Sequence, residues 1–291
     1  MKTRLIIEPH IHGAFGVDFN TASVGDILEV CKKLYSYRTG GIFPTLVTDT
    51  VENIKRQIDR IKLAREKQDK NSAKILGIHL EGIFLNPDKK GIHDANLFMP
   101  LTVDNYKKIE EDFIKIVTLA PELDEGLIEY LSEKGIKVQA GHCTSGDLSK
   151  CSGVTHLFNA MSGISHRGKS TALSALINDD LYTEIIADGV HLSDDTLKLV
   201  FKTKPASKII LVSDSLPVTH GNITETVFAG EKIFYDGEKA VSQNGTLAGS
   251  TMLIYDIVKR LIDNRMFNPQ FIENAYNYFE TEDIDGETTW D

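Results

Sequence analysis

Short apolar runs alternate with amphipathic stretches along most of this chain. The apolar runs predict eight buried strands, at Leu5–His10, Gly41–Leu46, Lys74–Leu80, Phe113–Leu119, Lys137–Ala140, Val154–Phe158, Tyr182–Ala187 and Lys208–Val212. Apolar residues that recur at helical spacing predict intervening helices at Asp26–Tyr35, Val51–Lys67, Glu125–Lys134, Ser193–Phe201 and Thr251–Asp263. Strands that alternate with helices indicate βα units and a parallel sheet.

Eight such strands could form either an open doubly wound sheet or a closed (β/α)₈ barrel. We expect the TIM-type barrel because polar residues gather at the C-terminal ends of several different strands, where barrel enzymes build their sites. The length of 291 residues also suits one barrel, which takes about 250 residues.

Two segments do not fit a plain count of βα units. Apolar and polar residues alternate near 227–242, and Asp236-Gly237 within this segment is a turn signal. This pattern predicts a hairpin insertion after the eighth strand. Glu280–Asp291 carries six acidic residues and no basic one, which favours a frayed end. We therefore expect a barrel over residues 1–270 and an acidic C-terminal tail over residues 271–291.

The composition of the chain limits which partners and which cellular compartment we expect for the protein. A net charge of −10 argues against nucleic acid and anionic membranes as partners. Apolar runs stay shorter than the roughly 18 residues that a membrane span needs, and the N-terminus lacks the apolar region of a signal peptide. Cys31, Cys143 and Cys151 have no paired spacing, so we expect reduced thiols in a cytoplasmic protein.

The first candidate functional residues are in His10-Ile11-His12, at the end of the first predicted strand. Alternate residues of a strand point to the same side, so this pair aims two imidazoles at one place. Four further strands end in another histidine or carboxylate, namely Glu81, His142, His156 and Asp214. Nitrogen and oxygen donors of these kinds suit Zn²⁺, Fe²⁺, Mn²⁺ or Co²⁺. The pattern therefore predicts a metal centre at the mouth of the barrel.

The chain resembles the N-acetylglucosamine-6-phosphate deacetylases of the amidohydrolase superfamily. The resemblance is collinear over roughly residues 5–260. Its blocks are His10–Gly13, Gly77–Phe84, Gly91–His93, Gly141-His142, Thr155–Met161, Ala187–His191, Ser213-Asp214 and Gly245–Ser250.

This resemblance implies a reaction and a set of roles. The acetamide of N-acetylglucosamine 6-phosphate would be hydrolysed to glucosamine 6-phosphate and acetate, by metal-activated water with Asp214 as acid and base. It implies a principal metal ion on Glu81, His142 and His156, and a second on His10 and His12, so that each chain binds one or two ions, Zn²⁺ being expected. Substrate would bind to His93, Asn159, Ala160, Arg167 and His191. In this family Arg167 would reach the pocket of a neighbouring subunit, which implies a homodimer.

The chain also departs from the family pattern. Nine residues precede His10, and nothing after Asp263 resembles the usual closing segment, so we expect the family's small β-sandwich domain to be absent. Ile83 stands where proline is usual, and Gly168–Ser170 replaces the run expected after Arg167. Two alternatives therefore stay open: an amidohydrolase that acts on a different acylated amino sugar, and a catalytically inactive paralogue that binds a sugar phosphate.

Overall fold

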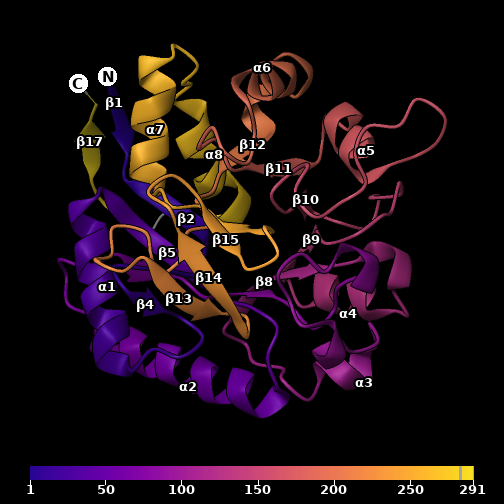
Figure 1. Ribbon diagram of the computed structural model, residues 1–291, viewed down its shortest axis with the longest axis horizontal. Helices are drawn as coiled ribbons and strands as arrows, with labels where there is room; N and C mark the ends of the chain where they lie inside the picture. The colour runs from indigo at the N-terminus through magenta and orange to yellow at the C-terminus, as the bar shows by residue number, and fades with distance from the viewer. Residues whose placement is uncertain (282–283, 291) are drawn as a thin grey trace.

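Eight parallel strands, in chain order, form a nearly closed barrel in the computed structural model, which describes residues 1–281 and 284–290 (Figure 1). They are β2 (Ile6–Ile11), β5 (Thr39–Leu46), β7 (Ile78–Glu81), β8 (Ile114–Leu119), β9 (Lys137–Ala140), β10 (Gly153–Val154), β11 (Tyr182–Ile185) and β12 (Ile209–Leu211). The predicted barrel is confirmed. The predicted third strand is divided in two, because β6 (Lys74–Ile75) and β7 pair with successive parts of β5.

The barrel closes through residues that follow β12. The amide N–H of Asp214 donates to the carbonyl of His10 over 2.9 Å, and that of His12 donates to the carbonyl of Ser215 over 3.0 Å. The buried carboxylate of Glu8 accepts the amide N–H of Ser213, at 3.2 Å from each of its oxygens. Closure therefore takes place beside the His10–His12 pair.

Helices pack their apolar faces against the outside of the barrel. Those predicted from periodicity are present as α1 (Val24–Ser36), α2 (Val51–Lys67), α4 (Leu127–Glu133), α6 (Asp194–Thr203) and α7 (Ile254–Asp263). The α2 helix begins after Thr50, whose hydroxyl accepts the N–H of Asn53, and it buries Ile54, Ile58 and Ile61. Shorter pieces are α3 (Val103–Tyr106), α5 (Thr171–Ile177) and single 3₁₀ turns at Pro87–Lys89, Ala95–Leu97, Pro121–Leu123 and Ala206–Lys208.

A further helix, α8 (Gln270–Phe279), lies where a tail was expected. It packs against β2 and β12, which are the two strands at the seam of the barrel. The Tyr276 hydroxyl donates to the carbonyl of Leu5 over 2.7 Å, and the buried amide of Asn274 donates to the carbonyls of Ala206 and Ile209, each over 2.7 Å. The helix thus covers the seam.

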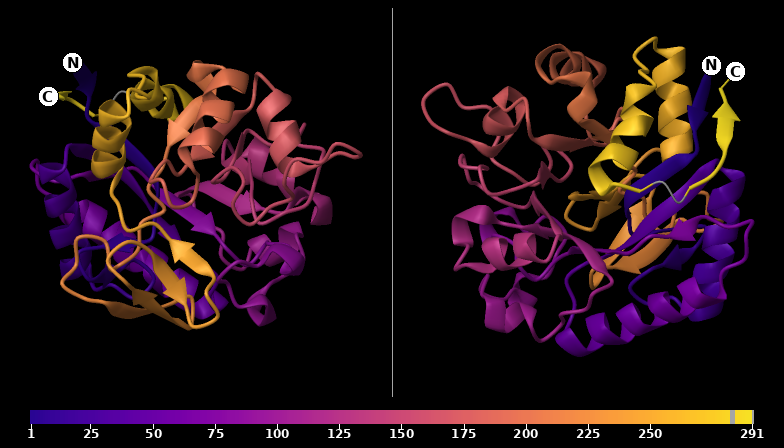
Figure 2. Two further views of the ribbon diagram at one scale, coloured as in Figure 1. Left: turned by 45° about the horizontal axis from the view of Figure 1, so that its top comes forward. Right: turned by 180° about the vertical axis from the view of Figure 1, so that it is seen from behind.

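The C-terminal end is also ordered beyond α8. Strand β17 (Glu287–Thr289) pairs antiparallel with β1 (Lys2–Arg4), so that the two ends of the chain lie side by side (Figure 2). Trp290 is buried, and its indole N–H donates to the Thr3 hydroxyl over 2.9 Å. The predicted acidic tail over residues 271–291 is therefore wrong for the described residues, because burial of apolar side chains outweighs the local acidic charge.

The insertion after the eighth strand is larger than the predicted hairpin. It is a four-stranded antiparallel sheet of β13 (Glu225–Phe228), β14 (Glu231–Tyr235), β15 (Ala240–Ser242) and β16 (Leu247–Gly249). The ring of Phe228 packs edge-on against that of His12, with the centroids 5.0 Å apart. The other extra strands are the short ribbon β3 (Gly13–Ala14) and β4 (Val17–Asp18). Residues 1–281 and 284–290 contain no β-sandwich.

None of the helices in the part of the chain that the structure describes is both long enough and apolar enough to cross a membrane.

The hydrogen bonds of Asn274 predict how much α8 contributes to the stability of the barrel at its seam. Asn274→Ala leaves the buried carbonyl of Ile209 and the partly buried carbonyl of Ala206 without this donor, and should lower the free energy of unfolding by roughly 2–4 kcal/mol. The urea unfolding midpoint measures this loss. Asn277→Ala, an exposed change on the same helix, is the matched control and should leave the midpoint nearly unchanged; equal midpoints for both variants would contradict the structural role of Asn274.

Candidate metal centre

The carboxylate of Glu81 lies at the middle of the cluster and is shared between two pairs of histidines. Its Oε1 is 2.8 Å from Nε2 of His156 and 3.3 Å from Nε2 of His142. Its Oε2 is 3.1 Å from Nε2 of His12 and 3.2 Å from Nε2 of His10. The structure therefore brings together all five residues that the sequence predicted as metal ligands, with one carboxylate between two imidazole pairs.

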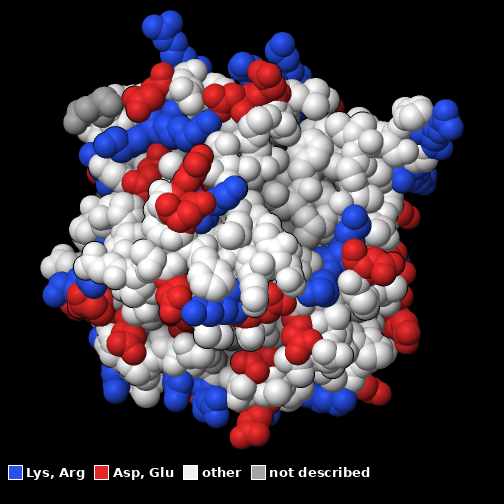
Figure 3. Space-filling view, viewed as in Figure 1, with Lys and Arg blue, Asp and Glu red and all other residues white. Residues whose placement is uncertain are grey.

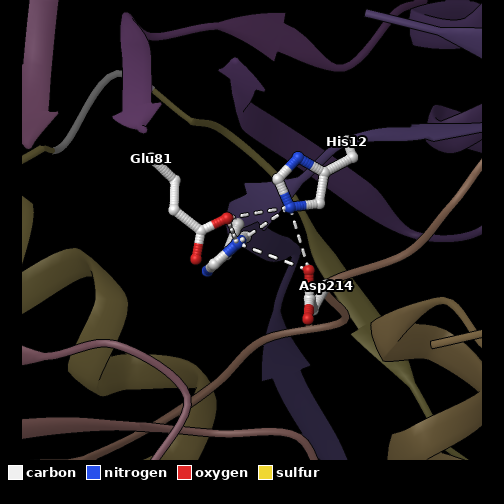
Figure 4. Close-up of side chains that lie close together, drawn as sticks. His12, Glu81 and Asp214 are labelled. Carbon is white, nitrogen blue, oxygen red and sulfur yellow. Dashed lines mark hydrogen bonds and ion pairs between the residues drawn. The ribbon is translucent and has the colours of Figure 1, made fainter. Parts of the chain in front are cut away.

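Asp214 joins the cluster from the segment after β12. Its Oδ1 is 3.0 Å from Nε2 of His12 and 3.4 Å from Nε2 of His10. Figure 4 shows the side chains of His12, Glu81 and Asp214 converging on one point from different elements. Asp214 also lines the open cleft above, so its carboxylate can meet a bound molecule.

Contacts on the far side of each ring orient the histidines. Nδ1 of His12 lies 3.3 Å from the carbonyl of Thr45, and Nδ1 of His142 lies 2.8 Å from the carbonyl of Lys89. Because a carbonyl can only accept a hydrogen bond, Nδ1 carries the proton in each ring. A neutral ring of this kind points the lone pair of Nε2 into the cluster, as a metal ligand must.

The donor atoms fit a transition-metal ion. Zinc–nitrogen bonds of about 2.0–2.1 Å in a tetrahedron place neighbouring ligand atoms roughly 3.3 Å apart, close to the separations around Glu81. The electrostatics also call for a cation: burial lowers the pKa of His12, but Asp214 and Glu81 outweigh it and raise that pKa to about 9. We conclude that these residues suit a divalent ion with nitrogen and oxygen ligands.

Several strand ends adopt strained backbone conformations. His142, His156 and Asp214 have φ angles of +47°, +33° and +53°, in the left-handed region that residues other than glycine rarely adopt. Such strain is typical of functional sites, where the surrounding structure fixes an unfavourable conformation. Ile83 lies at φ +56°, which a proline ring fixed near about −65° cannot adopt. The departure from the family pattern at this position thus agrees with the local backbone.

His93 is held beside the cluster in a defined tautomer. The backbone N–H of Thr48 donates to Nδ1 of His93 over 3.4 Å, and the Thr48 hydroxyl, which accepts the N–H of Ile83 over 3.0 Å, lies 2.9 Å from the same nitrogen. Nδ1 is therefore an acceptor, and Nε2 carries the proton and lies 4.0 Å from Glu81. Gly82 permits this arrangement, because a Cβ there would lie 2.3 Å from the backbone nitrogen of Thr48.

A cleft of about 350 Å³ opens above the cluster. Among the predicted substrate-binding residues, it is lined by His93, Asn159, Ala160 and His191. The carboxylate of Asp188 fixes His191, since its Oδ2 lies 2.7 Å from Nδ1 of that ring and its Oδ1 accepts the N–H of His191 over 2.8 Å. The β16 segment Leu247–Gly249 and Phe228 form an apolar wall.

Arg167 does not lie in this cleft. It is exposed on the loop before α5, where its Nε donates to the ring of His166 over 3.0 Å. As far as the described residues are concerned, Lys89 is the one lysine or arginine that lines the cleft. Figure 3 shows acidic and basic side chains interspersed over the face seen in Figure 1, without one large basic surface. An anionic group bound here would therefore need Lys89, His191 or a cation from another chain.

The loop that carries Arg167 also matches a known sequence motif. Gly163–Ser170 spells G-x-x-x-x-G-K-S, the pattern of a nucleotide phosphate-binding loop. Such a loop should follow a strand directly, whereas β10 ends at Val154 and a long turn intervenes. The structure therefore does not support a nucleotide site at this loop.

Four site residues were not found by sequence reasoning: Thr48, Lys89, Asp188 and Glu184. Thr48 and Lys89 lie outside the barrel strands, and their positions beside the histidines depend on tertiary contacts that sequence periodicity does not predict. Glu184 gave a usable signal, because a charged residue inside the buried run of β11 needs a partner. Its Oε2 lies 3.2 Å from Nδ1 of His10.

Cys143, beside His142, is a packed thiol as predicted. It is buried, and burial raises its pKa to about 12.

A barrel with a histidine and carboxylate centre at its C-terminal mouth defines the class of metal-dependent barrel hydrolases. Curated proteins of this kind resemble the chain. N-acetylglucosamine-6-phosphate deacetylase of Bacillus subtilis is 34% identical over 261 residues, which are 85% of this chain and 66% of that protein. N-acetylgalactosamine-6-phosphate deacetylase of Escherichia coli O157:H7 is 27% identical over 273 residues, which are 88% of this chain and 71% of that protein.

A solved structure agrees with these relatives. The N-acetylglucosamine-6-phosphate deacetylase of Thermotoga maritima superimposes with a TM-score of 0.87 at 27% identity, over 96% of this chain and 79% of that one. No family model matches the chain. By sequence and by fold, the chain belongs to the N-acetylglucosamine-6-phosphate deacetylase family. It spans about two thirds of the length of the curated relatives it matches, 66% for the Bacillus subtilis protein.

The donor set predicts a stabilising response to zinc. Adding Zn²⁺ to chelator-treated protein should raise the melting temperature, because an ion at a thousandfold excess over its Kd adds about 4 kcal/mol to the folded state. Mg²⁺, which prefers oxygen ligands, should give little response. Glu81→Gln removes the charge shared by both histidine pairs and should abolish the zinc response. Equal melting curves with and without Zn²⁺ would contradict the assignment of a metal centre.

Proposed function

We propose that this protein hydrolyses the acetamide of N-acetylglucosamine 6-phosphate, giving glucosamine 6-phosphate and acetate. The observation that carries the proposal is the position of Asp214, which lies 3.0 Å from His12 and also faces the cleft. A protein that merely bound a sugar phosphate would have no use for this carboxylate at that point. Membership of the deacetylase family supports the same reaction.

Asp214 is the acid and base of the proposed reaction. The chemistry supplied by a bound divalent ion is Lewis acidity, which lowers the pKa of water and polarises a carbonyl oxygen. The residues to hold the principal ion are Glu81, His142 and His156, with His10 and His12 for a second. Asp214 takes the proton of the attacking water and returns it to the nitrogen that leaves as the amine.

His93 is the proposed donor to the acetamide oxygen. Thr48 keeps the proton of this ring on Nε2, on the side of the cluster. Burial lowers the pKa of His93, so the ring donates as a neutral imidazole. A donor held in place before the reaction stabilises the negative charge that develops on the carbonyl oxygen.

We propose that the sugar phosphate binds toward His191, Asn159 and Ala160, and that Arg167 of a neighbouring copy completes the site. Arg167 is exposed and does not line the cleft of its own chain, as we expect of a residue that serves another subunit. A guanidinium binds phosphate through a planar pair of donors. The proposal therefore includes a homodimer.

The remaining proposals concern the ion, the compartment and the sugar. Zn²⁺ is the proposed ion because it accepts imidazole and carboxylate ligands at these separations. A cytoplasmic location is proposed from the three free cysteines. The similarity to a protein named for N-acetylgalactosamine 6-phosphate makes the epimeric sugar the second candidate substrate.

Acetate release tests the reaction. The zinc-loaded protein should release acetate from N-acetylglucosamine 6-phosphate faster than from the epimer or the unphosphorylated sugar. Asp214→Asn should lower kcat by about 10²–10⁴, because the proton transfer is lost. Asp195→Asn, an exposed change on α6, is the control and should keep the activity. A variant at Asp214 as active as the parent protein would refute its role, and zinc-loaded protein inactive on all three sugars would refute the deacetylase function.

Mixing two impaired variants tests the shared site. Arg167→Ala should raise KM, and Asp214→Asn should lower kcat, each in its own homodimer. In a mixed dimer, the chain with intact Asp214 receives Arg167 from its partner, so one complete site forms. Reassembly of equal amounts should restore up to about a quarter of the parent activity, since half of the dimers are mixed. Activity no higher than the sum of the two homodimers would show that Arg167 does not serve a neighbouring subunit.

A further inference from the structure

Glu184 is a buried carboxylate that the proposed reaction does not use. It lies on β11, is 1% exposed, and directs Oε2 at Nδ1 of His10 over 3.2 Å. Its other oxygen, Oε1, is buried without a hydrogen-bond partner. Among the described residues its ion-pair partner is His10. A buried carboxylate in this state is costly unless a positive charge lies close by.

His79, the other histidine of this region, directs its ring nitrogens at other partners than Glu184. Nδ1 of His79 lies 3.0 Å from the carbonyl of Pro9, and its Nε2 lies 2.7 Å from the Thr118 hydroxyl. Both nitrogens are therefore engaged, although His79, His10 and Glu184 lie close enough together to resemble a metal site. Among the described residues, Glu184 therefore contacts the candidate metal centre through His10.

We propose that Glu184 is a positioning residue that enables the His10–His12 pair to hold an ion of its own. Glu184 accepts a hydrogen bond from Nδ1–H of His10, which fixes the tautomer with the Nε2 lone pair directed at Glu81 and Asp214. An ion on Nε2 strengthens Nδ1–H as a donor, and the carboxylate makes the ring a stronger ligand. This inference rests on the metal-dependent function proposed above.

The effect should be confined to one half of the centre. On the other side of Glu81, Nδ1 of His142 donates to the carbonyl of Lys89 and not to a side-chain carboxylate. Nδ1 of His156 has no partner among the described residues. Neither contact involves Glu184, so a change there should weaken the ion held by His10 and His12 and spare the ion held by His142 and His156.

Counting bound ions tests the inference without any measurement of turnover. Chelator-treated full-length protein is titrated with Zn²⁺ against a chromophoric chelator, and bound zinc is measured by mass spectrometry. The parent protein should bind two ions. Glu184→Gln should bind the first as tightly as the parent and the second about 10- to 100-fold more weakly. Because binding is measured apart from acetate release, an inactive protein that behaves in this way would refute the proposed reaction and still support the role of Glu184.

Asp188→Asn is the matched control. Asp188 is also a buried carboxylate, 2.7 Å from Nδ1 of a histidine at the same end of the barrel, but its partner His191 lies outside the cluster. This variant should bind both ions like the parent. Glu184→Asp replaces Glu184→Gln if the glutamine variant does not fold; it withdraws the oxygen by one methylene and should show the same selective loss.

Three outcomes would overturn the inference. The first is a folded Glu184 variant that binds both ions as tightly as the parent. The second is an equal weakening of both ions in a folded variant, which would show a general effect on the centre. The third is a parent protein that binds a single ion, because no second position would then depend on Glu184.

Discussion

The hydrogen bond from the Asp214 N–H to the carbonyl of His10 joins the last strand segment of the barrel to the first. It lies at the seam, where β2 and β12 do not pair as strands, and it is reinforced by the bond from His12 to Ser215. His10 and His12 are candidate ligands and Asp214 is the proposed acid. The same hydrogen bonds therefore close the barrel and bring these side chains together. Any change that opens the seam therefore disperses the ligands as well as the core.

The sequence predicted most of the barrel and all five candidate ligands, because both depend on short-range rules. Strand periodicity directs His10 and His12 to one side, and parallel strands bring their C-terminal ends to one rim. The α8 helix was not predicted, although Phe271, Ile272 and Ala275 follow helical spacing, because the acidic composition of the residues after it favours a frayed end. The role of Thr48 depends on which side chains meet across the barrel, which no spacing along the chain reveals. A charge within the buried run of β11 indicates that Glu184 needs a partner, but it does not indicate which residue that partner is.

Buried polar side chains occupy part of the interior of this barrel. Below the candidate ligands, the hydroxyls of Thr118 and Thr155 lie 2.7 Å apart, and Thr155 in turn contacts Gln139 at 2.9 Å. Such a network keeps each buried polar group partnered but contributes less to stability than apolar packing would. Together with the left-handed strand ends, it indicates that stability is given up in order to hold the ligands in place, a compromise common at functional sites.

The seam of the barrel forms late, because the segments that meet there are far apart along the chain. The edge of β2 is formed early, yet its partners at Asp214 and Ser215 and the covering helix α8 come more than half a chain later. Contacts that distant in sequence slow folding, and an unpaired strand edge is prone to pair with other chains in the meantime. Until α8 has been synthesised, the nascent barrel exposes this edge, and we expect chaperone binding to matter most at that stage.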